Sequence, residues 1–165
     1  MRQVAVIGPG EATPEQETDA ERLGAGLARL GLTVVTGGLG GVMAAASRGA
    51  RAAGGRTLGL LPGNDPATAN PWIDVVVPTG LGEARNALVV RSAAAVVAVG
   101  HGWGTLSEVA LALRTGVPVV SLRSWAPTPP AGDPRHRDQP TSVQVATGVT
   151  DALARVQAVL EAAVP

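Results

Sequence analysis

Short apolar runs and helical patterns alternate along most of the chain. Runs rich in Val, Leu, Ile and Ala, which are typical of strands, occupy 3–7, 33–36, 57–61, 73–77, 93–99, 117–122 and 142–146. Between most of them, apolar residues recur at spacings of three and four, which predicts helices. Because a single helix separates such strands, we expect parallel pairing with right-handed crossovers. The alternation predicts one α/β domain over residues 1–165, with a mostly parallel sheet and helices on both faces.

Several residues are expected to mark where helices begin and end. Thr13, with Pro14 and Gln16 after it, fits a capping box with proline at the first helical position. Thr150 is expected to cap the closing helix. Between 124 and 140 the composition changes to Pro, Gly and charged residues, which predicts an irregular or mobile loop.

A glycine-rich turn follows the strand at 93–99. Gly100, Gly102 and Gly104 allow a tight turn, and Thr105 then opens a helical pattern. Backbone N–H groups and the helix dipole at such a helix start attract negative charge. The turn therefore predicts a phosphate site.

A second glycine-rich turn, GGLGGVM at 37–43, follows the strand at 33–36. Two such turns on parallel strands would face each other at the carboxyl edge of the sheet, where α/β proteins bind ligands. The first strand also ends in glycines, Gly8-x-Gly10. The third glycine of the dinucleotide fingerprint is replaced by Thr13, however, and no acidic residue ends the second strand, which argues against NAD or FAD.

Arg85 and Glu108 could turn the phosphate cradle into a reaction centre. Glu108 lies one turn inside the new helix, and Arg85 lies on the preceding helix, toward the same end of the sheet. Each residue also has a simpler interpretation. Thr105 and Glu108 form a capping-box pattern, in which both side chains only satisfy backbone donors, and a lone arginine near a helix start is often a surface residue.

Missing residue types exclude several kinds of chemistry. The chain has no cysteine, and therefore no disulfide or thiolate metal site. It has no lysine either, which excludes an internal aldimine with pyridoxal phosphate and a Walker-type lysine. Because Tyr and Phe are also absent, stacking of a flat ligand depends on Trp72, Trp103, Trp125, histidine or arginine.

Charge and hydropathy limit the partners. The formal net charge is +0 at pH 7, which gives no electrostatic footprint for nucleic acid or an acidic membrane. No apolar run reaches the roughly 18 residues of a membrane span, and the first residues lack a signal-peptide pattern. We therefore expect a cytoplasmic protein that binds neither nucleic acid nor membrane.

The two glycine turns resemble the signatures of the LONELY GUY (LOG) family of the SLOG superfamily, long mislabelled as lysine decarboxylases. Residues 37–43 match its GGxxGxM motif, and residues 100–108, GHGWGTLSE, resemble its PGGxGTxxE motif. The resemblance spans 4–122, and GEARN at 82–86 is most similar to a small-protein branch that includes molybdenum cofactor carriers. It implies a Rossmann-like fold that binds a nucleoside 5′-monophosphate or a similar phosphorylated ligand.

The resemblance implies a phosphoribohydrolase, which cleaves the N-glycosidic bond of a nucleoside 5′-monophosphate to give a free base and ribose 5-phosphate. Its essential pair falls on Arg85 and Glu108, with no metal and no required cofactor. A homodimer or larger homo-oligomer is expected. The alternative is a non-catalytic carrier that holds the phosphate of the molybdenum cofactor, with Glu108 only a cap. The expected ligand-binding residues are Gly37, Gly38, Gly41, Met43, Asn86, His101, Gly102, Trp103, Gly104 and Thr105.

Two positions depart from the family pattern. Gly100-His101-Gly102 stands where the motif begins PGG, and Arg85-Asn86 stands where plant-type LOG enzymes have Arg-Lys. Both changes argue against a cytokinin-type substrate and leave the phosphate cradle intact. His101 is interpreted either as a turn residue or as a ligand contact at the edge of the helix start.

Overall fold

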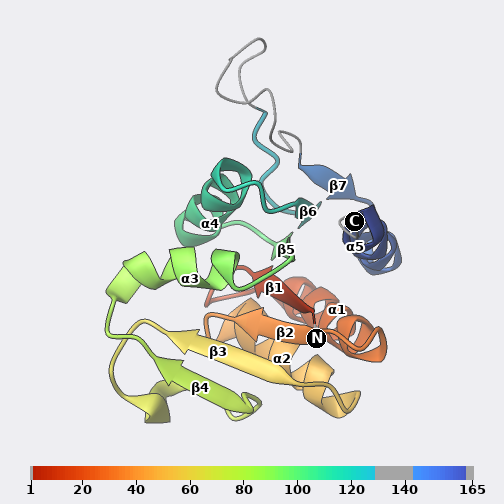
Figure 1. Ribbon diagram of the computed structural model, residues 1–165. Coiled ribbons are helices and arrows are strands. Elements are labelled where there is room, and N and C mark those ends of the chain that lie inside the picture. Colours follow the sequence, from red (N-terminus) through yellow and green to blue (C-terminus); the bar gives the residue numbers. More distant parts are fainter. Residues whose placement is uncertain (1, 129–142, 163–165) are drawn as a thin grey trace.

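A seven-stranded sheet with the order β4-β3-β2-β1-β5-β6-β7 forms the centre of the molecule. It is seen in a computed structural model that describes residues 2–128 and 143–162 (Figure 1). All strand pairings are parallel, as expected from the single-helix crossovers. The strands are β1 Gln3–Ile7, β2 Thr33–Thr36, β3 Thr57–Leu61, β4 Val75–Pro78, β5 Ala95–Val99, β6 Val119–Leu122 and β7 Gln144–Ala146.

Helices cover both faces of this sheet, which confirms the predicted Rossmann-like α/β class. The helices are α1 Pro14–Arg29, α2 Gly41–Ala52, α3 Asn86–Arg91, α4 Trp103–Arg114 and α5 Val149–Ala162, with 3-10 turns η1 Pro66–Thr68 and η2 Gly82–Arg85. Figure 1 shows α3 and α4 on one side, and α1, α2 and α5 on the other.

The two cores follow from the alternation of side chains along each strand. Val4 and Val6 of β1 pack with α1, α2 and α5 in one buried cluster. Ala5 and Ile7 point the other way and join a second cluster with α3 and α4. Because the central strands are buried on both faces, they read as continuous apolar runs in the sequence.

The capping box at Thr13 is confirmed, and the Thr150 cap is wrong. Thr13 and Gln16 satisfy each other's backbone N–H groups at the start of α1. Thr150 lies inside α5, where the Ala152 N–H donates to the Gly148 carbonyl. The carboxylate of Asp151 instead accepts the N–H that precedes the helix, from Thr147. Asp151 thus connects the first turn of the helix to the residue before it, and its negative charge at the helix start is favourable.

Strand boundaries move by up to two residues from the sequence expectation. The runs at 73–77, 93–99, 117–122 and 142–146 each begin two residues later in the structure, as β4, β5, β6 and β7. The leading residues of the first three connect the preceding element to the sheet. The irregular loop expected at 124–140 lies for the most part outside the described residues.

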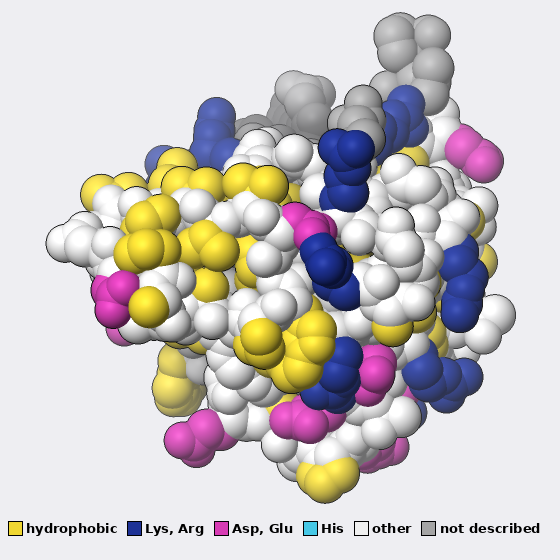
Figure 2. Space-filling view, turned by 90° about the horizontal axis from the view of Figure 1, so that it is seen from below, with side chains coloured by type: hydrophobic (Ala, Val, Ile, Leu, Met, Phe, Trp, Pro, Cys, Tyr) yellow, Lys and Arg dark blue, Asp and Glu magenta, His cyan; other side chains and the backbone are white. Residues whose placement is uncertain are grey.

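Part of the sheet face shared with α3 and α4 is uncovered. Val75 and Val77 of β4 pair with Leu58 and Leu60, so they point to this face, and they are 55% and 37% exposed. Leu81 before η2 and Leu88 of α3 are also exposed, at 52% and 40%. We call Val75, Val77, Leu81 and Leu88 the β4–α3 face. Figure 2 shows the molecule from the β4 edge, and hydrophobic side chains gather on one side of that view.

Within the described residues, none of the helices combines the length and the apolar character needed to cross a membrane.

Candidate functional site

A cavity of about 240 Å³ opens at the carboxyl ends of β1, β2 and β5. The chain order of the sheet reverses between β1 and β5, and open α/β sheets bind ligands at such a switch point. The cavity is therefore where the topology places a ligand. Its lining residues are Ile7, Gly8, Pro9, Gly10, Gly37, Met43, Arg85, Asn86, Gly102, Gly104, Thr105 and Glu108.

The N-terminus of α4 provides backbone donors to this cavity. Gly102 caps the helix, and the first intrahelical bond runs from the Leu106 N–H to the Gly102 carbonyl, at 2.9 Å. The N–H groups of Trp103, Gly104 and Thr105 precede that bond and have no partner within the helix. Together with the helix dipole, they favour an anion.

The capping-box interpretation of Thr105 and Glu108 is wrong. The helix starts three residues earlier than a cap at Thr105 would place it, so Thr105 occupies its third position instead of the cap. Thr105 is 2% exposed, and its hydroxyl oxygen is buried without a hydrogen-bond partner. A buried hydroxyl of this kind in a cavity lining is available to a molecule that enters the cavity, either water or a ligand.

Arg85 reaches the cavity from the end of η2. Its guanidinium packs against the backbone of Gly37, where a Cβ atom would lie 2.3 Å from Nη1. The glycine of the second turn therefore makes room for the arginine. Arg85 is 7% exposed, and its Nε is buried without a hydrogen-bond partner. Burial lowers the pKa of Arg85 from its ordinary value, with Glu108 acting in the opposite direction, and the guanidinium remains a cation at neutral pH.

Glu108 is a buried carboxyl group beside this cation. It is 7% exposed, and burial raises the pKa of Glu108 to about 7, although the charge of Arg85 acts to lower it. Desolvation of the charged form therefore outweighs the attraction of the guanidinium. Near neutral pH this group can release or accept a proton, which suits acid–base work as well as simple hydrogen bonding.

Gly38 and Gly41 do not line the cavity, contrary to the expectation that the second turn faces the phosphate. A Cβ atom at Gly38 would lie 2.7 Å from Leu61, and one at Gly41 would lie 2.4 Å from the Pro9 carbonyl. The Val42 N–H, at the start of α2, donates to that same carbonyl at 3.1 Å. These glycines allow close packing against neighbouring backbone and side chains.

The turn after β1 is the part of the site that sequence reasoning missed. Ile7, Gly8, Pro9 and Gly10 all line the cavity. The signal was the Gly8-x-Gly10 pattern, which was examined only as a dinucleotide fingerprint. Gly8 allows the turn to approach β5, because a Cβ atom there would lie 2.5 Å from the Val99 carbonyl.

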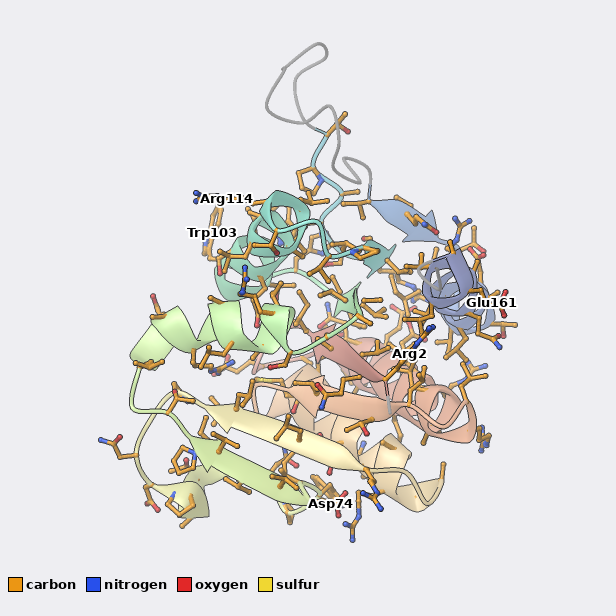
Figure 3. The ribbon with its side chains drawn as sticks, in the orientation of Figure 1. Arg2, Asp74, Trp103, Arg114 and Glu161 are labelled. Carbon is orange, nitrogen blue, oxygen red and sulfur yellow. The ribbon has the colours of Figure 1, made fainter. Side chains whose placement is uncertain are left out.

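The remaining predicted residues divide between the cavity and its outer edge. Met43 lines the cavity, and Asn86 lines it while donating from Nδ2 to the Ser107 hydroxyl at 3.2 Å. His101 and Trp103 lie outside the lining. Both contact Trp125, and Figure 3 shows Trp103 on the outer side of α4. Residues 2–128 and 143–162 contain no group of three or more His, Asp or Glu side chains arranged to hold a metal ion.

The fold and the cavity define a Rossmann-like α/β protein with a ligand site at its topological switch point. Residues 1–153 match the SLOG cluster4 family, and the chain belongs to this family. This confirms the resemblance of the two glycine turns to LOG-type signatures.

Solved structures and a curated relative extend the comparison. The chain is 36% identical to the molybdenum cofactor binding protein from the phototrophic bacterium Rippkaea orientalis, with a TM-score of 0.85 over 96% of this chain and 97% of that one. It is 37% identical to the molybdenum cofactor carrier protein MCP from Chlamydomonas reinhardtii, with a TM-score of 0.83 over 97% and 98% of the two chains. An uncharacterised protein of Archaeoglobus fulgidus is 41% identical over 123 residues, which are 74% of this chain and 81% of that one.

Replacing Glu108 by Gln should remove a pH dependence of stability. Because the pKa of Glu108 is raised from 4.5 to about 7 in the folded protein, its contribution is present below pH 4.5 and is lost as the pH rises through 7. The loss amounts to about 3 kcal/mol. Urea unfolding from pH 4 to pH 8 should show the Glu108→Gln protein gaining stability relative to wild type by about this amount. Glu161→Gln, at an exposed position, serves as control, and its free energy of unfolding should change with pH as that of wild type does. If the stability of Glu108→Gln fell with pH as much as that of wild type, the prediction would be contradicted.

Replacing Thr105 by Val should separate stability from binding. The Thr105 hydroxyl has no partner in the free protein, so its loss should leave the free energy of unfolding unchanged or raise it. Affinity for ribose 5-phosphate, measured by calorimetry, should fall by about tenfold, because a hydrogen bond to a charged group is lost. Thr18→Val, on the exposed side of α1, should change neither affinity nor the site. If Thr105→Val bound ribose 5-phosphate as tightly as wild type, the Thr105 hydroxyl would not contact the ligand.

Proposed function

We propose that this protein binds a small phosphorylated ligand in the cavity between β1 and β5, and that the ligand is the molybdenum cofactor, which the protein carries without changing it. The observation that carries this proposal is the 36–37% identity, over 96–97% of the chain, with the cofactor-binding and cofactor-carrier proteins of Rippkaea orientalis and Chlamydomonas reinhardtii. The cofactor is the cargo in this proposal, and its phosphate is the group that the cavity would hold.

The chemistry of the cavity supports the phosphate. The free N–H groups at the start of α4 point to one end of the cavity, where Gly102, Gly104 and Thr105 line it. The unpartnered Thr105 hydroxyl and Arg85 Nε add two more donors. Charged hydrogen bonds of this kind contribute about 1.5–3 kcal/mol each, so several donors converging on a phosphate give useful affinity without a metal ion.

Asn86 favours a carrier over a LOG-type hydrolase. Plant-type LOG enzymes have a lysine at this position, which would place a second cation beside Arg85. Here the Asn86 amide donates to the Ser107 hydroxyl, which itself donates to the Gly104 carbonyl at 2.7 Å. The residue therefore ties α3 to the start of α4 and adds no charge to the cavity.

Phosphoribohydrolase activity is the second candidate, and the buried pair of Arg85 and Glu108 favours it. In this reaction the bond between the base nitrogen and ribose C1′ breaks, water adds to C1′, and the base leaves with a proton. The transition state is oxocarbenium-like, so an ionised Glu108 would stabilise its positive charge or take the proton of the attacking water. A pKa of about 7 leaves much of Glu108 ionised at neutral pH.

One pair of measurements tests both candidates. Wild type, Glu108→Gln and Thr105→Val are mixed under anaerobic conditions with molybdenum cofactor released from a donor enzyme, and pterin and metal are measured in the protein fraction after gel filtration. The same proteins are incubated with a panel of nucleoside 5′-monophosphates, and free base is measured by chromatography. A carrier should retain the cofactor in wild type and Glu108→Gln, lose most of it in Thr105→Val, and release no base. Base release by wild type that disappears in Glu108→Gln would overturn the carrier proposal in favour of the hydrolase.

We also propose that two copies of the chain pair through the β4–α3 face. Its four apolar side chains are 37–55% exposed. Val75 and Val77 lie on the open part of the sheet, Leu81 precedes η2, and Leu88 lies on α3. Contiguous apolar surface of this kind is typical of protein–protein contacts.

The cytoplasmic location and the exclusion of nucleic acid stay predictions from composition.

The pairing is testable by sedimentation velocity at micromolar concentration. Wild type should sediment as a dimer, and the double substitution Val75→Glu and Leu81→Glu should give a monomer, because charged groups cannot be buried there without a partner. Val145→Glu is the matched control, since Val145 is 56% exposed but lies on β7 at the opposite edge of the sheet. A monomeric wild type would refute the pairing.

A further inference from the structure

Three aromatic rings gather at the start of α4, outside the cavity lining. The Trp103 and Trp125 rings are stacked, with centroids 6.1 Å apart and an interplanar angle of 26°. The His101 ring meets the Trp125 ring edge-on, with centroids 5.1 Å apart and an angle of 80°. This group contains two of the three tryptophans of a chain that has no Tyr or Phe. The concentration of aromatic surface at one helix start calls for a physical explanation.

Trp125 holds this group in place next to the cavity. Its indole Nε1 donates to the Gly102 carbonyl at 3.1 Å. Gly102 caps α4 and lines the cavity, so the bond ties the indole directly to the backbone of the anion site. The position of the Trp125 ring is therefore fixed relative to the donors that a phosphate would meet.

Trp103 is left with a free aromatic surface. Trp125 covers one of its faces, and the residue is nevertheless 81% exposed. A spacing of 6.1 Å does not admit another ring between the two indoles, so any further stacking must occur on the outer face of Trp103. Trp72 offers a contrast, because the guanidinium of Arg48 already lies over its ring at 5.3 Å.

The position of Trp103 in the chain connects that surface to the cavity. It lies between Gly102 and Gly104, which both line the cavity, and its own N–H belongs to the free donors of the helix start. Figure 3 shows its side chain on the outer side of α4. A ligand whose phosphate is held at these N–H groups would reach the aromatic surface if the rest of the molecule extends out of the cavity past the start of α4.

We propose that the outer face of Trp103, backed by Trp125, stacks on the planar heteroaromatic ring of the ligand whose phosphate is held at the start of α4. The inference rests on the proposed phosphate site and adds the second recognition element, a flat conjugated ring. A nucleobase and a pterin share this chemistry. Stacking is tolerant of ring type because every such ring has a π-face, and Trp103 loses little conformational freedom because Trp125 already orients it.

The test separates the ring from the phosphate by using two probes. One is a C-nucleoside 5′-monophosphate, whose carbon–carbon glycosidic bond cannot be hydrolysed; the other is ribose 5-phosphate, which has the same phosphate and sugar without the ring. Calorimetry should show wild type binding the nucleotide at least about tenfold more tightly than ribose 5-phosphate. In Trp103→Ala the nucleotide affinity should fall about tenfold to that of ribose 5-phosphate, which itself should bind unchanged.

Controls and a third probe make the outcomes distinct. Trp103→Phe keeps an aromatic face and should retain most of the ring-dependent affinity, and Trp72→Phe should match wild type. A pterin monophosphate identifies the source of the ring, since the probe with the larger loss in Trp103→Ala is the better mimic of the natural ligand. Two results would overturn the inference while leaving the phosphate site intact. In one, wild type binds the C-nucleoside 5′-monophosphate and ribose 5-phosphate with equal affinity; in the other, the Trp103→Ala protein keeps the preference for the nucleotide. Failure of wild type to bind any probe would overturn the proposed phosphate site and the inference with it.

Discussion

The site depends on the close approach of the turn after β1 to its two neighbours. A Cβ atom at Gly8 would lie 2.5 Å from the Val99 carbonyl of β5, and one at Gly41 would lie 2.5 Å from the Gly10 carbonyl. The Val42 N–H of α2 donates to Pro9 in the same place. Backbone therefore meets backbone on both sides of the turn. This contact fixes where the turn after β1 lies relative to the end of β5 and the start of α2, and so the position of the cavity wall that Ile7, Gly8, Pro9 and Gly10 form.

The groups around the cavity are costly to leave without a ligand. Thr105 and Arg85 each bury a polar atom without a partner, and an unsatisfied buried donor costs about 1–3 kcal/mol. Folding tolerates these groups because the remainder of both cores is apolar and continuous. An anion that accepts hydrogen bonds from them would recover part of that free energy on binding. The same groups that weaken the free protein are thus the ones that would favour the binding of an anion.

The strand and helix order could be predicted from the sequence because the central strands are buried on both faces. Their runs are dominated by Val and other apolar residues, with few polar residues among them, and most are followed by a pattern with helical spacing. The strand limits were predicted less accurately, because β4, β5, β6 and β7 each begin two residues later than expected. β4 and β7 have exposed residues, so their composition does not distinguish strand from connecting loop.

The site was predicted in outline and not in detail, for reasons that particular residues make clear. Arg85 and Glu108 come together because α3 and α4 lie on the same face, which the parallel order implies. Whether a glycine faces a ligand or a neighbouring strand depends on tertiary packing, so Gly38 and Gly41 could not be told from Gly37 by sequence alone. Thr105 was misplaced because a capping-box pattern needs only the right spacing, whereas Gly102 provides the actual cap. The aromatic cluster could not be predicted from a local sequence pattern, because Trp125 lies more than twenty positions after His101 and Trp103 in the chain.

The protonation state of Glu108 links the two candidate functions. A phosphate near this carboxyl group is a like charge, and it therefore favours the protonated form of Glu108, in addition to the effect of burial. Arg85 opposes this by stabilising negative charge on either group. A carrier works with Glu108 neutral, because the carboxyl group can then lie beside the phosphate without repelling it. A hydrolase needs Glu108 ionised while the phosphate is bound, and Arg85 is the neighbouring cation that favours this state. The lysine of plant-type LOG enzymes would add a second cation beside this pair, whereas Asn86 adds no charge, so the protonation state of Glu108 with a phosphate bound distinguishes the proposed carrier from the hydrolase.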